Sequence, residues 1–276
     1  MKFRTMIFLA IFSLSTLQAF ADPLQKFSIT CSLFPVYDFS REVAGEFADV
    51  KLLLRPGVEP HEFEPSPMDI KALNDSQVFM FVGEVMEPWA KKLSSTLNGL
   101  KIIDTSENIE LVNNDPHIWL DLTLAQKMVM KIYECLCEFD PVHAENFRHN
   151  AENYCEKLSR LDEKFMALNK NQTLVFAGEF AAGYFMRRYG FDYVSAYDGE
   201  NEPSIKRMAE ILRFINENQT RYIFSPPLVS AITRSISEQT GTEILTFDSC
   251  EVVAPENSFI DIMQKNYEAL RVALDD

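Results

Sequence analysis

Short apolar runs alternate along this chain with longer stretches in which apolar positions recur every three or four residues. Short apolar runs bounded by turn residues are typical of buried strands, and the longer repeat is typical of amphipathic helices. In the first half, the pattern predicts strands at 27–32, 50–54, 77–82 and 100–103, with helices at 35–44, 66–74 and 88–97. Because strands and helices alternate, we expect a parallel sheet with both faces covered.

The second half of the chain repeats this alternation. It predicts strands at 173–177, 192–196, 221–224 and 243–247, with helices at 182–189, 205–218, 228–239 and 258–274. We therefore expect an α/β fold with two similar lobes, each a mainly parallel sheet flanked by helices. A ligand of such a fold would bind in the cleft between the lobes, beyond the carboxyl ends of the strands.

Two helical stretches separate the halves. The first is predicted at 122–139, and Pro141 then stands where a proline in a first turn would start the next helix. Residues 143–168 contain no Gly or Pro, so they predict a helix of about 26 residues and about 39 Å. We expect this helix to mark the boundary between an N-terminal lobe (22–140) and a C-terminal lobe (169–276), with the linking segment at 141–168. The alternative is an ordinary long surface helix within one domain.

The first 21 residues have the pattern of a secretory signal. Lys2 and Arg4 precede an apolar run at 6–14, and the small-residue site Ala19-Phe20-Ala21 precedes Asp22. No cysteine follows the run as a lipid-attachment site. We expect cleavage near Asp22 and a soluble periplasmic protein without a lipid anchor.

The charge of the chain limits its partners. The net charge of −15 becomes −17 when Lys2 and Arg4 are removed, since −15 − 2 = −17 and residues 1–21 hold no acid. An acidic surface argues against nucleic-acid binding and raises the local concentration of cations, although it also simply keeps an exported protein soluble. The five cysteines are an odd number for an oxidising compartment, and we expect buried thiols without a metal.

Four residues at strand ends carry the candidate chemistry. His61 and His117 lie in proline-flanked loops behind predicted strands of the first half, and Glu179 and Asp248 follow predicted strands of the second. Two imidazoles and two carboxylates are ligands for a first-row transition ion, and carboxylates favour harder ions such as Mn²⁺. Asp115 and Asp121 are candidate partners that would orient the His117 ring.

Each candidate also has an ordinary interpretation. His61 fits an exposed loop histidine, Asp248 a capping residue, and Glu179 a strand-end carboxylate pointing to water. His143 and His149 fall on the long helix among polar residues, and we assign them to its solvated face.

Several motifs make the chain similar to a known family. They are the segments 56–67, 87–89, 115–121, 183–185, 188–190, 202–204 and 241–248. In this order and spacing the chain resembles the zinc/manganese family of periplasmic metal-binding proteins, the solute receptors of ABC importers (cluster A-I, or cluster 9). Among the departures from the family pattern are Leu122, where a proline is usual, and the Ala177-Gly178 pair before Glu179.

The resemblance implies a periplasmic receptor, monomeric and not an enzyme, that binds one divalent metal ion and delivers it to a membrane permease. It implies the metal ligands His61, His117, Glu179 and Asp248, and a backbone helix that joins the two lobes. Zinc-transporting relatives commonly have His at the third position, so Glu179 favours Mn²⁺ as the transported ion, with Zn²⁺ or Fe²⁺ as alternatives. Zn²⁺ binds nearly any such site more tightly than Mn²⁺, so a zinc receptor with the same ligands remains the main alternative.

Other functional classes fit the sequence less well. The chain has no Gly-x-Ser-x-Gly, no His-Glu-x-x-His and no glycine-rich phosphate loop. A metal-dependent hydrolase would need an open coordination position, which four protein ligands would fill. An adhesin is disfavoured by the missing lipid anchor, and a siderophore receptor would not need this ligand set.

Overall fold

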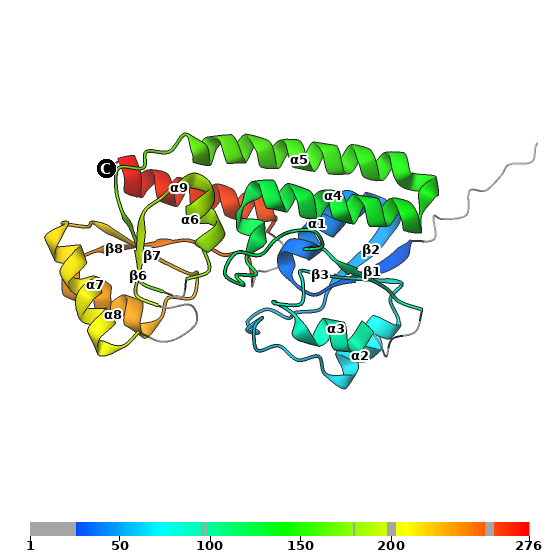
Figure 1. Cartoon of the computed structure of the whole chain (residues 1–276), viewed down its shortest axis with the longest axis horizontal. Helices are drawn as coiled ribbons and strands as arrows, with labels where there is room; N and C mark the ends of the chain where they lie inside the picture. Colours follow the sequence, from blue (N-terminus) through cyan, green and yellow to red (C-terminus); the bar gives the residue numbers. More distant parts are fainter. Residues whose placement is uncertain are drawn as a thin grey trace, which may run out of the picture.

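The computed structural model describes residues 26–275 apart from 95, 96, 98, 179, 198–202 and 252–256. The predicted signal segment at 1–21 therefore lies outside the described residues. Figure 1 shows two lobes side by side, with long helices running above both of them. The predicted fold class is confirmed, since each lobe contains a parallel four-stranded sheet flanked by helices.

The N-terminal lobe is built on a sheet in the order β2-β1-β3-β4. Its strands are β1 (Phe27–Cys31), β2 (Ala48–Leu52), β3 (Val78–Phe81) and β4 (Lys101–Asp104), and its helices are α1 (Phe34–Ala44), α2 (Pro67–Asn74) and α3 (Pro88–Ser94). Helix α2 begins with a capping box, in which the side chains of Ser66 and Asp69 each accept a hydrogen bond from the other's backbone N–H. The cap fixes the end of the loop that carries His61.

The C-terminal lobe repeats this arrangement in the order β6-β5-β7-β8. Its strands are β5 (Leu174–Phe176), β6 (Tyr193–Ser195), β7 (Tyr222–Ser225) and β8 (Glu243–Thr246), and its helices are α6 (Gly183–Tyr189), α7 (Ile205–Glu217) and α8 (Ala231–Thr240). Helix α8 begins later than the predicted residue 228, because the Ser230 side chain caps it by accepting from Thr233 N–H. Leu228 lies before the cap and is 90% exposed.

Three further helices pack along the two lobes. They are α4 (Leu122–Phe139), α5 (Ala144–Met166) and α9 (Phe259–Asp275). In Figure 1, α5 extends over both lobes, with α4 beside it over the first lobe and α9 over the second. One face of α5 is buried along its whole length, from Phe147 through Leu158 to Phe165, so this helix links the lobes through a continuous core.

A buried carboxylate joins these helices near the junction of the lobes. Asp38 of α1 has no exposed surface, accepts a hydrogen bond from the Tyr154 hydroxyl of α5 (2.8 Å), and caps α9 by accepting from Phe259 N–H (3.1 Å). Arg41 pairs with it at 2.6 Å. Burial raises the pKa of Asp38, while these partners act in the opposite direction.

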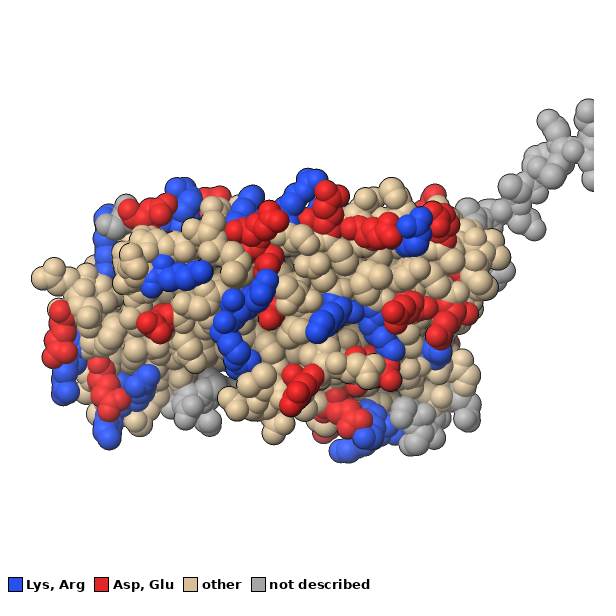
Figure 2. All heavy atoms as spheres, turned by 45° about the horizontal axis from the view of Figure 1, so that its top comes forward, with Lys and Arg blue, Asp and Glu red and all other residues tan. Residues whose placement is uncertain are grey.

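The outer surface carries both charges. On the face shown in Figure 2, blue basic and red acidic side chains alternate over the helices instead of forming separate patches. In the part of the chain that the structure describes, no helix is both long and apolar enough to cross a membrane. All five cysteines are free thiols, of which Cys31, Cys135 and Cys250 are buried as expected, while Cys137 and Cys155 are only partly buried.

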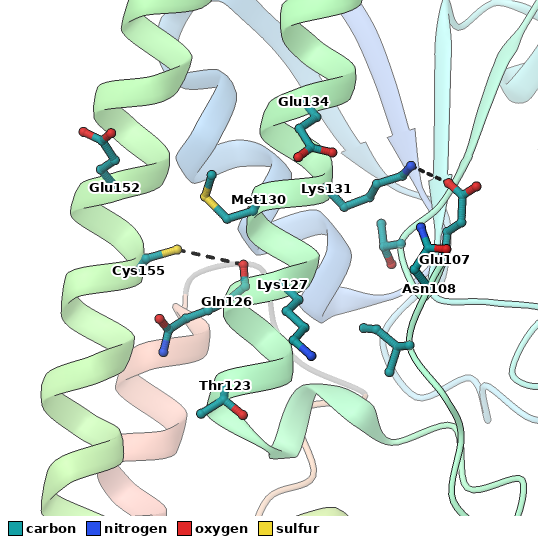
Figure 3. A pocket seen from close by; sticks show the side chains of 12 residues that line it. Glu107, Asn108, Thr123, Gln126, Lys127, Met130, Lys131, Glu134, Glu152 and Cys155 are labelled. Atoms are coloured by element: carbon teal, nitrogen blue, oxygen red, sulfur yellow. Dashed lines mark hydrogen bonds and ion pairs between the residues drawn. The ribbon is translucent and has the colours of Figure 1, made fainter.

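A hollow of about 700 Å³ lies between α4, α5 and the loop after β4. Figure 3 shows Lys127 and Lys131 of α4 near Glu107 and Asn108 of that loop, with an ion pair between Lys131 and Glu107. Its lining residues include neither of the two histidines proposed as ligands, so this hollow is separate from the candidate metal centre.

Candidate metal centre

His61 lies in the loop that leaves the carboxyl end of β2 and leads to α2. Its backbone N–H donates to the Glu59 side chain (3.3 Å), which turns the loop at this position. The His61 side chain is only 15% exposed, so the imidazole points into the protein. The alternative interpretation, an exposed loop histidine, is therefore wrong.

His117 follows β4 and stands directly before a single 3-10 turn, Ile118–Leu120. Asp115 holds it twice, because one carboxylate oxygen lies 3.0 Å from the His117 backbone nitrogen and 2.7 Å from Nδ1 of the ring. This contact favours a proton on Nδ1, so Nε2 is the nitrogen that would bind a metal ion, in exchange for its own proton. The prediction that Asp115 orients the ring is thus supported by the geometry.

Asp121, the other predicted partner of His117, has a different role. Its carboxylate caps α4 by accepting from Thr123 N–H (2.9 Å), and it lies 3.7 Å from the Arg188 guanidinium. An aspartate at this position is the preferred start of a helix.

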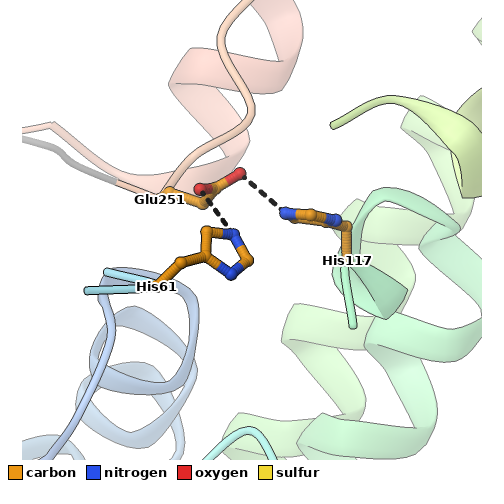
Figure 4. Close-up of side chains that lie close together, drawn as sticks. All are labelled: His61, His117 and Glu251. Atoms are coloured by element: carbon orange, nitrogen blue, oxygen red, sulfur yellow. Dashed lines mark ion pairs between the residues drawn. The ribbon is translucent and has the colours of Figure 1, made fainter. Parts of the chain in front are cut away.

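The third residue beside the two histidines is Glu251, in the loop after β8. Glu251 Oε1 lies 3.2 Å from His117 Nε2, and Oε2 lies 3.8 Å from His61 Nε2. Figure 4 shows the carboxylate facing both rings. One ligand atom from each residue lies within 4.8 Å of the others, a spacing that a single ion can bridge. The group brings two imidazoles of the N-terminal lobe to a carboxylate of the C-terminal lobe.

Electrostatic interactions within this group are strong because it is buried. Burial by itself lowers the pKa of His117, but the close carboxylates of Asp115 and Glu251 outweigh it and raise the pKa to about 10. Burial alone would raise the pKa of Glu251, whereas His117 and His61 lower it overall. His117 Nε2 and Glu251 Oε1 are buried, and neither has a well-aligned hydrogen bond to another described residue. Such atoms fit a bound cation.

The two acidic ligands predicted from the sequence have different outcomes. Asp248 lies outside the close group of the two histidines and Glu251. Its carboxylate forms a turn by accepting from Cys250 N–H at 2.8 Å, and burial raises its pKa. Glu179 lies outside the described residues. The full set of His61, His117, Glu179 and Asp248 therefore stays a prediction.

Glu251 is not among the acidic ligands predicted from the sequence, which lie close behind the apolar runs. Asp248 follows β8 directly, and Glu251 comes only three residues later. Between them, Cys250 has a positive φ of 63°, a conformation that turns the chain sharply and that a cysteine seldom adopts. The available signal was the second acid in the same strand-end loop.

A cavity of about 510 Å³ adjoins this group between the lobes. The N-terminal lobe contributes residues 57–59, and the C-terminal lobe contributes, among others, Phe176, Phe247, Asp248 and Glu251. Asp248 therefore shares with Glu251 a space that opens between the lobes.

The chain matches the family described as ZnuA, zinc-uptake complex component A periplasmic, over residues 29–273. It is 31% identical to the zinc-binding lipoprotein AdcA of Streptococcus pneumoniae, over 91% of this chain and 56% of AdcA. It thus spans about half the length of that relative. It is 27% identical to the high-affinity zinc uptake system protein ZnuA of Bacillus subtilis, over 90% of this chain and 88% of that protein.

Solved structures show the same fold. The Zn(II)-bound ZnuA-like domain of Streptococcus pneumoniae AdcA is 30% identical with a TM-score of 0.80, covering 91% of this chain and 100% of that domain. The laminin-binding protein Lmb of Streptococcus agalactiae, described as a bifunctional protein with adhesin and metal transporting activity, is 27% identical with a TM-score of 0.81, over 91% of this chain and 100% of Lmb. Since the family match covers nearly the whole chain and the fold agrees, this protein belongs to the ZnuA family of metal-binding receptors.

Proposed function

We propose that this protein is the receptor of an ABC importer, binding one divalent transition-metal ion between its lobes and delivering it to a membrane permease. The observation that carries the proposal is the convergence of His61 and His117 from one lobe on Glu251 from the other. No element of one lobe supplies all three side chains, so the ion itself would complete the contact between the lobes.

The division of ligands suits a carrier. If the loop that carries Glu251 moves away from the N-terminal lobe, the two imidazoles separate from the carboxylate, and an ion held by all three loses part of its coordination at once. Affinity would then fall sharply with a small opening, which is what transfer to a permease requires. A hydrolytic enzyme would instead need an ion held firmly while substrate exchanges beside it.

Zinc is the cargo that we now favour. Two imidazoles and a carboxylate are typical zinc ligands, and Zn²⁺ adds a fourth to complete a tetrahedron. The relatives AdcA and ZnuA are named for zinc, and AdcA has a Zn(II)-bound structure. Glu179 and Asp248 are the candidates for the fourth ligand.

Manganese remains the second candidate because the position of Glu179 holds a carboxylate. Two histidines with several carboxylate oxygens would give the higher coordination number and harder ligands that Mn²⁺ prefers.

Export by the segment at 1–21, residence in the periplasm and a monomeric state are further parts of the proposal. The family description as periplasmic supports the first two.

The test is a set of single substitutions with metal affinity measured by competition against a chromophoric chelator. His61→Ala and Glu251→Gln should each weaken Zn²⁺ binding at least tenfold, or about 1.4 kcal/mol. Asp248→Asn keeps the oxygen that accepts from Cys250 N–H, so it should cost less than Glu251→Gln unless Asp248 is itself a ligand. His149→Ala is the matched control, since His149 is exposed on α5 and pairs with Asn153. Unchanged affinity in both His61→Ala and Glu251→Gln would overturn the proposal.

A further inference from the structure

Trp119 connects the two sides of the candidate metal centre. It follows His117 by two residues, and its ring packs edge-on against the His117 ring with centroids 5.3 Å apart. Its indole Nε1 donates a hydrogen bond of 2.7 Å to the Ser249 carbonyl, in the loop that carries Glu251. The side chain is fully buried. One residue of the N-terminal lobe thus contacts a predicted ligand of its own lobe and the ligand loop of the other.

Ser249 extends this connection to the carboxylate. Ser249 stands two residues before Glu251 in the same loop, and its carbonyl accepts from Trp119, so this bond holds the backbone that carries the carboxylate. A closed circuit therefore runs from Trp119 to the Ser249 carbonyl, along the backbone of the loop to Glu251, from Glu251 to His117, and from His117 back to Trp119.

The loop is also anchored from its own lobe. The buried Asn266 amide of α9 clamps Asp248, donating to its carbonyl at 2.8 Å and accepting from its N–H at 2.9 Å. With Asp248 fixed on one side, the Trp119 bond at the next residue ties the loop to the N-terminal lobe.

The other tryptophan of the chain, Trp89, gives a useful contrast. Trp89 is buried among the side chains around β3 and α3, and its Nε1 has no hydrogen-bond partner among the described residues. Indole N–H groups usually find a partner when buried. The N–H of Trp119 finds its partner across the lobes, which packing alone does not require.

We propose that Trp119 is a positioning residue that holds the Glu251 loop against His117 and thereby slows release of the bound metal ion. The inference rests on the proposed function, because it concerns the same site. The ion can leave only when Glu251 and the histidines separate, and this separation must break the Trp119–Ser249 bond. The bond therefore acts on the rate of metal release more than on the rate of capture.

The experiment compares Trp119→Phe with Trp89→Phe in the full mature chain. Both substitutions replace a buried indole with a smaller ring, but only the first removes the bond to Ser249. Zinc-loaded protein is mixed with excess chelator, and Zn²⁺ release is followed by stopped flow. We expect release about tenfold faster from Trp119→Phe and within twofold of the parent from Trp89→Phe. Equal release rates in Trp119→Phe and the parent would overturn the inference.

Two further readouts separate positioning from mere packing. In a Glu251→Gln background, Trp119→Phe should change the release rate less than twofold, because its effect acts through Glu251. A full additional tenfold change there would contradict the inference. In Trp89→Phe, Trp119 is the remaining tryptophan, so Zn²⁺ should change the tryptophan fluorescence emission. An unchanged emission would also contradict the inference. If the parent protein binds no metal, the proposed function fails; if it binds but Trp119→Phe behaves like the parent, only this inference fails.

Discussion

Asp115 and Gly183 meet across the lobes so closely that a Cβ atom at position 183 would lie 2.6 Å from Asp115 Oδ2. Gly183 is the first residue of α6, in the C-terminal lobe. The other oxygen of Asp115 holds the His117 ring. The absence of a side chain at 183 is therefore what lets the two lobes close around the residue that orients His117.

We predict that Gly183→Ala weakens Zn²⁺ binding about tenfold, or about 1.4 kcal/mol. The added methyl group would displace Asp115 and tilt the His117 ring, or hold the lobes apart. Isothermal titration against a competing chelator measures the change in Zn²⁺ affinity.

Gly190→Ala is the control, because Gly190 has a φ of +70° and a Cβ atom placed there would have no other atom within 4 Å. It should destabilise the fold by about 1 kcal/mol and leave the affinity unchanged. Equal affinities in Gly183→Ala and the parent would show that the close approach has no role in binding.

Glu87 predicts a pH dependence of stability. This carboxyl is buried and accepts from Gly83 N–H at 3.1 Å, and burial raises its pKa to about 7 despite this bond and those from Ser32 and Val82. The folded pKa lies above the unfolded one, so the contribution of Glu87 is fully present below about pH 4.5 and is lost as the pH rises through 7.

The measurement is urea unfolding of the parent protein and Glu87→Gln at several pH values. The free energy of unfolding of the parent, minus that of the variant, should fall by roughly 3 kcal/mol between pH 4.5 and 7.5. Taking the difference removes the contribution of carboxyls that do not interact with Glu87. A difference that stays constant over this range would mean that Glu87 is ionised throughout.

Metal binding should stabilise the folded protein. A ligand that binds only the folded state at a hundredfold excess over its Kd adds about 2.7 kcal/mol, which corresponds to a rise in Tm of roughly 5 to 10 °C for a chain of this size. Zn²⁺ should give this rise in scanning calorimetry, and Mn²⁺ a smaller one. Mg²⁺ and Ca²⁺ should give little, since imidazole ligands suit neither ion. A shift with Ca²⁺ as large as with Zn²⁺ would point to an oxygen-only site elsewhere.

Position 179 should tune the choice of metal. Glu179→His would replace a carboxylate by a third imidazole, which is closer to the tetrahedral set that Zn²⁺ favours. We predict that it lowers Mn²⁺ affinity by more than it changes Zn²⁺ affinity, as measured by competition titration of both ions. A Mn²⁺/Zn²⁺ affinity ratio that stays constant or rises would contradict the prediction that Glu179 tunes the site toward Mn²⁺.

Local sequence was sufficient to predict most of the fold. Apolar runs and capping residues are short-range signals, so each of the eight predicted strands and the long linking helix overlaps its counterpart in the structure, with β2 two residues earlier than predicted. The start of α8 was placed too early because Leu228 extends the apolar spacing, although its side chain remains exposed before the Ser230 cap. His143, assigned to a solvated face, instead stacks on Phe47 with ring centroids 4.2 Å apart, a long-range contact that a helical pattern does not contain.

The candidate site was predictable only in part. The two histidines stand out by their rarity and their strand-end loops, and they lie together with ring centroids 5.3 Å apart. Which acid of the last loop reaches them depends on the turn at Cys250 and on the Asn266 clamp 18 residues after Asp248. Neither contact follows from the order of residues within the loop.

The buried Asp38 also bears on how cargo can enter and leave. It fastens the linking helix and the last helix to the first lobe through a phenol and a backbone amide, both shielded from water. A large rotation of one lobe relative to the other would break these hydrogen bonds and leave the buried Asp38 without its partners. We therefore expect the two sheets and the long helices to keep their relative positions during uptake and release. Only the loops that carry the candidate ligands would move to let the ion pass.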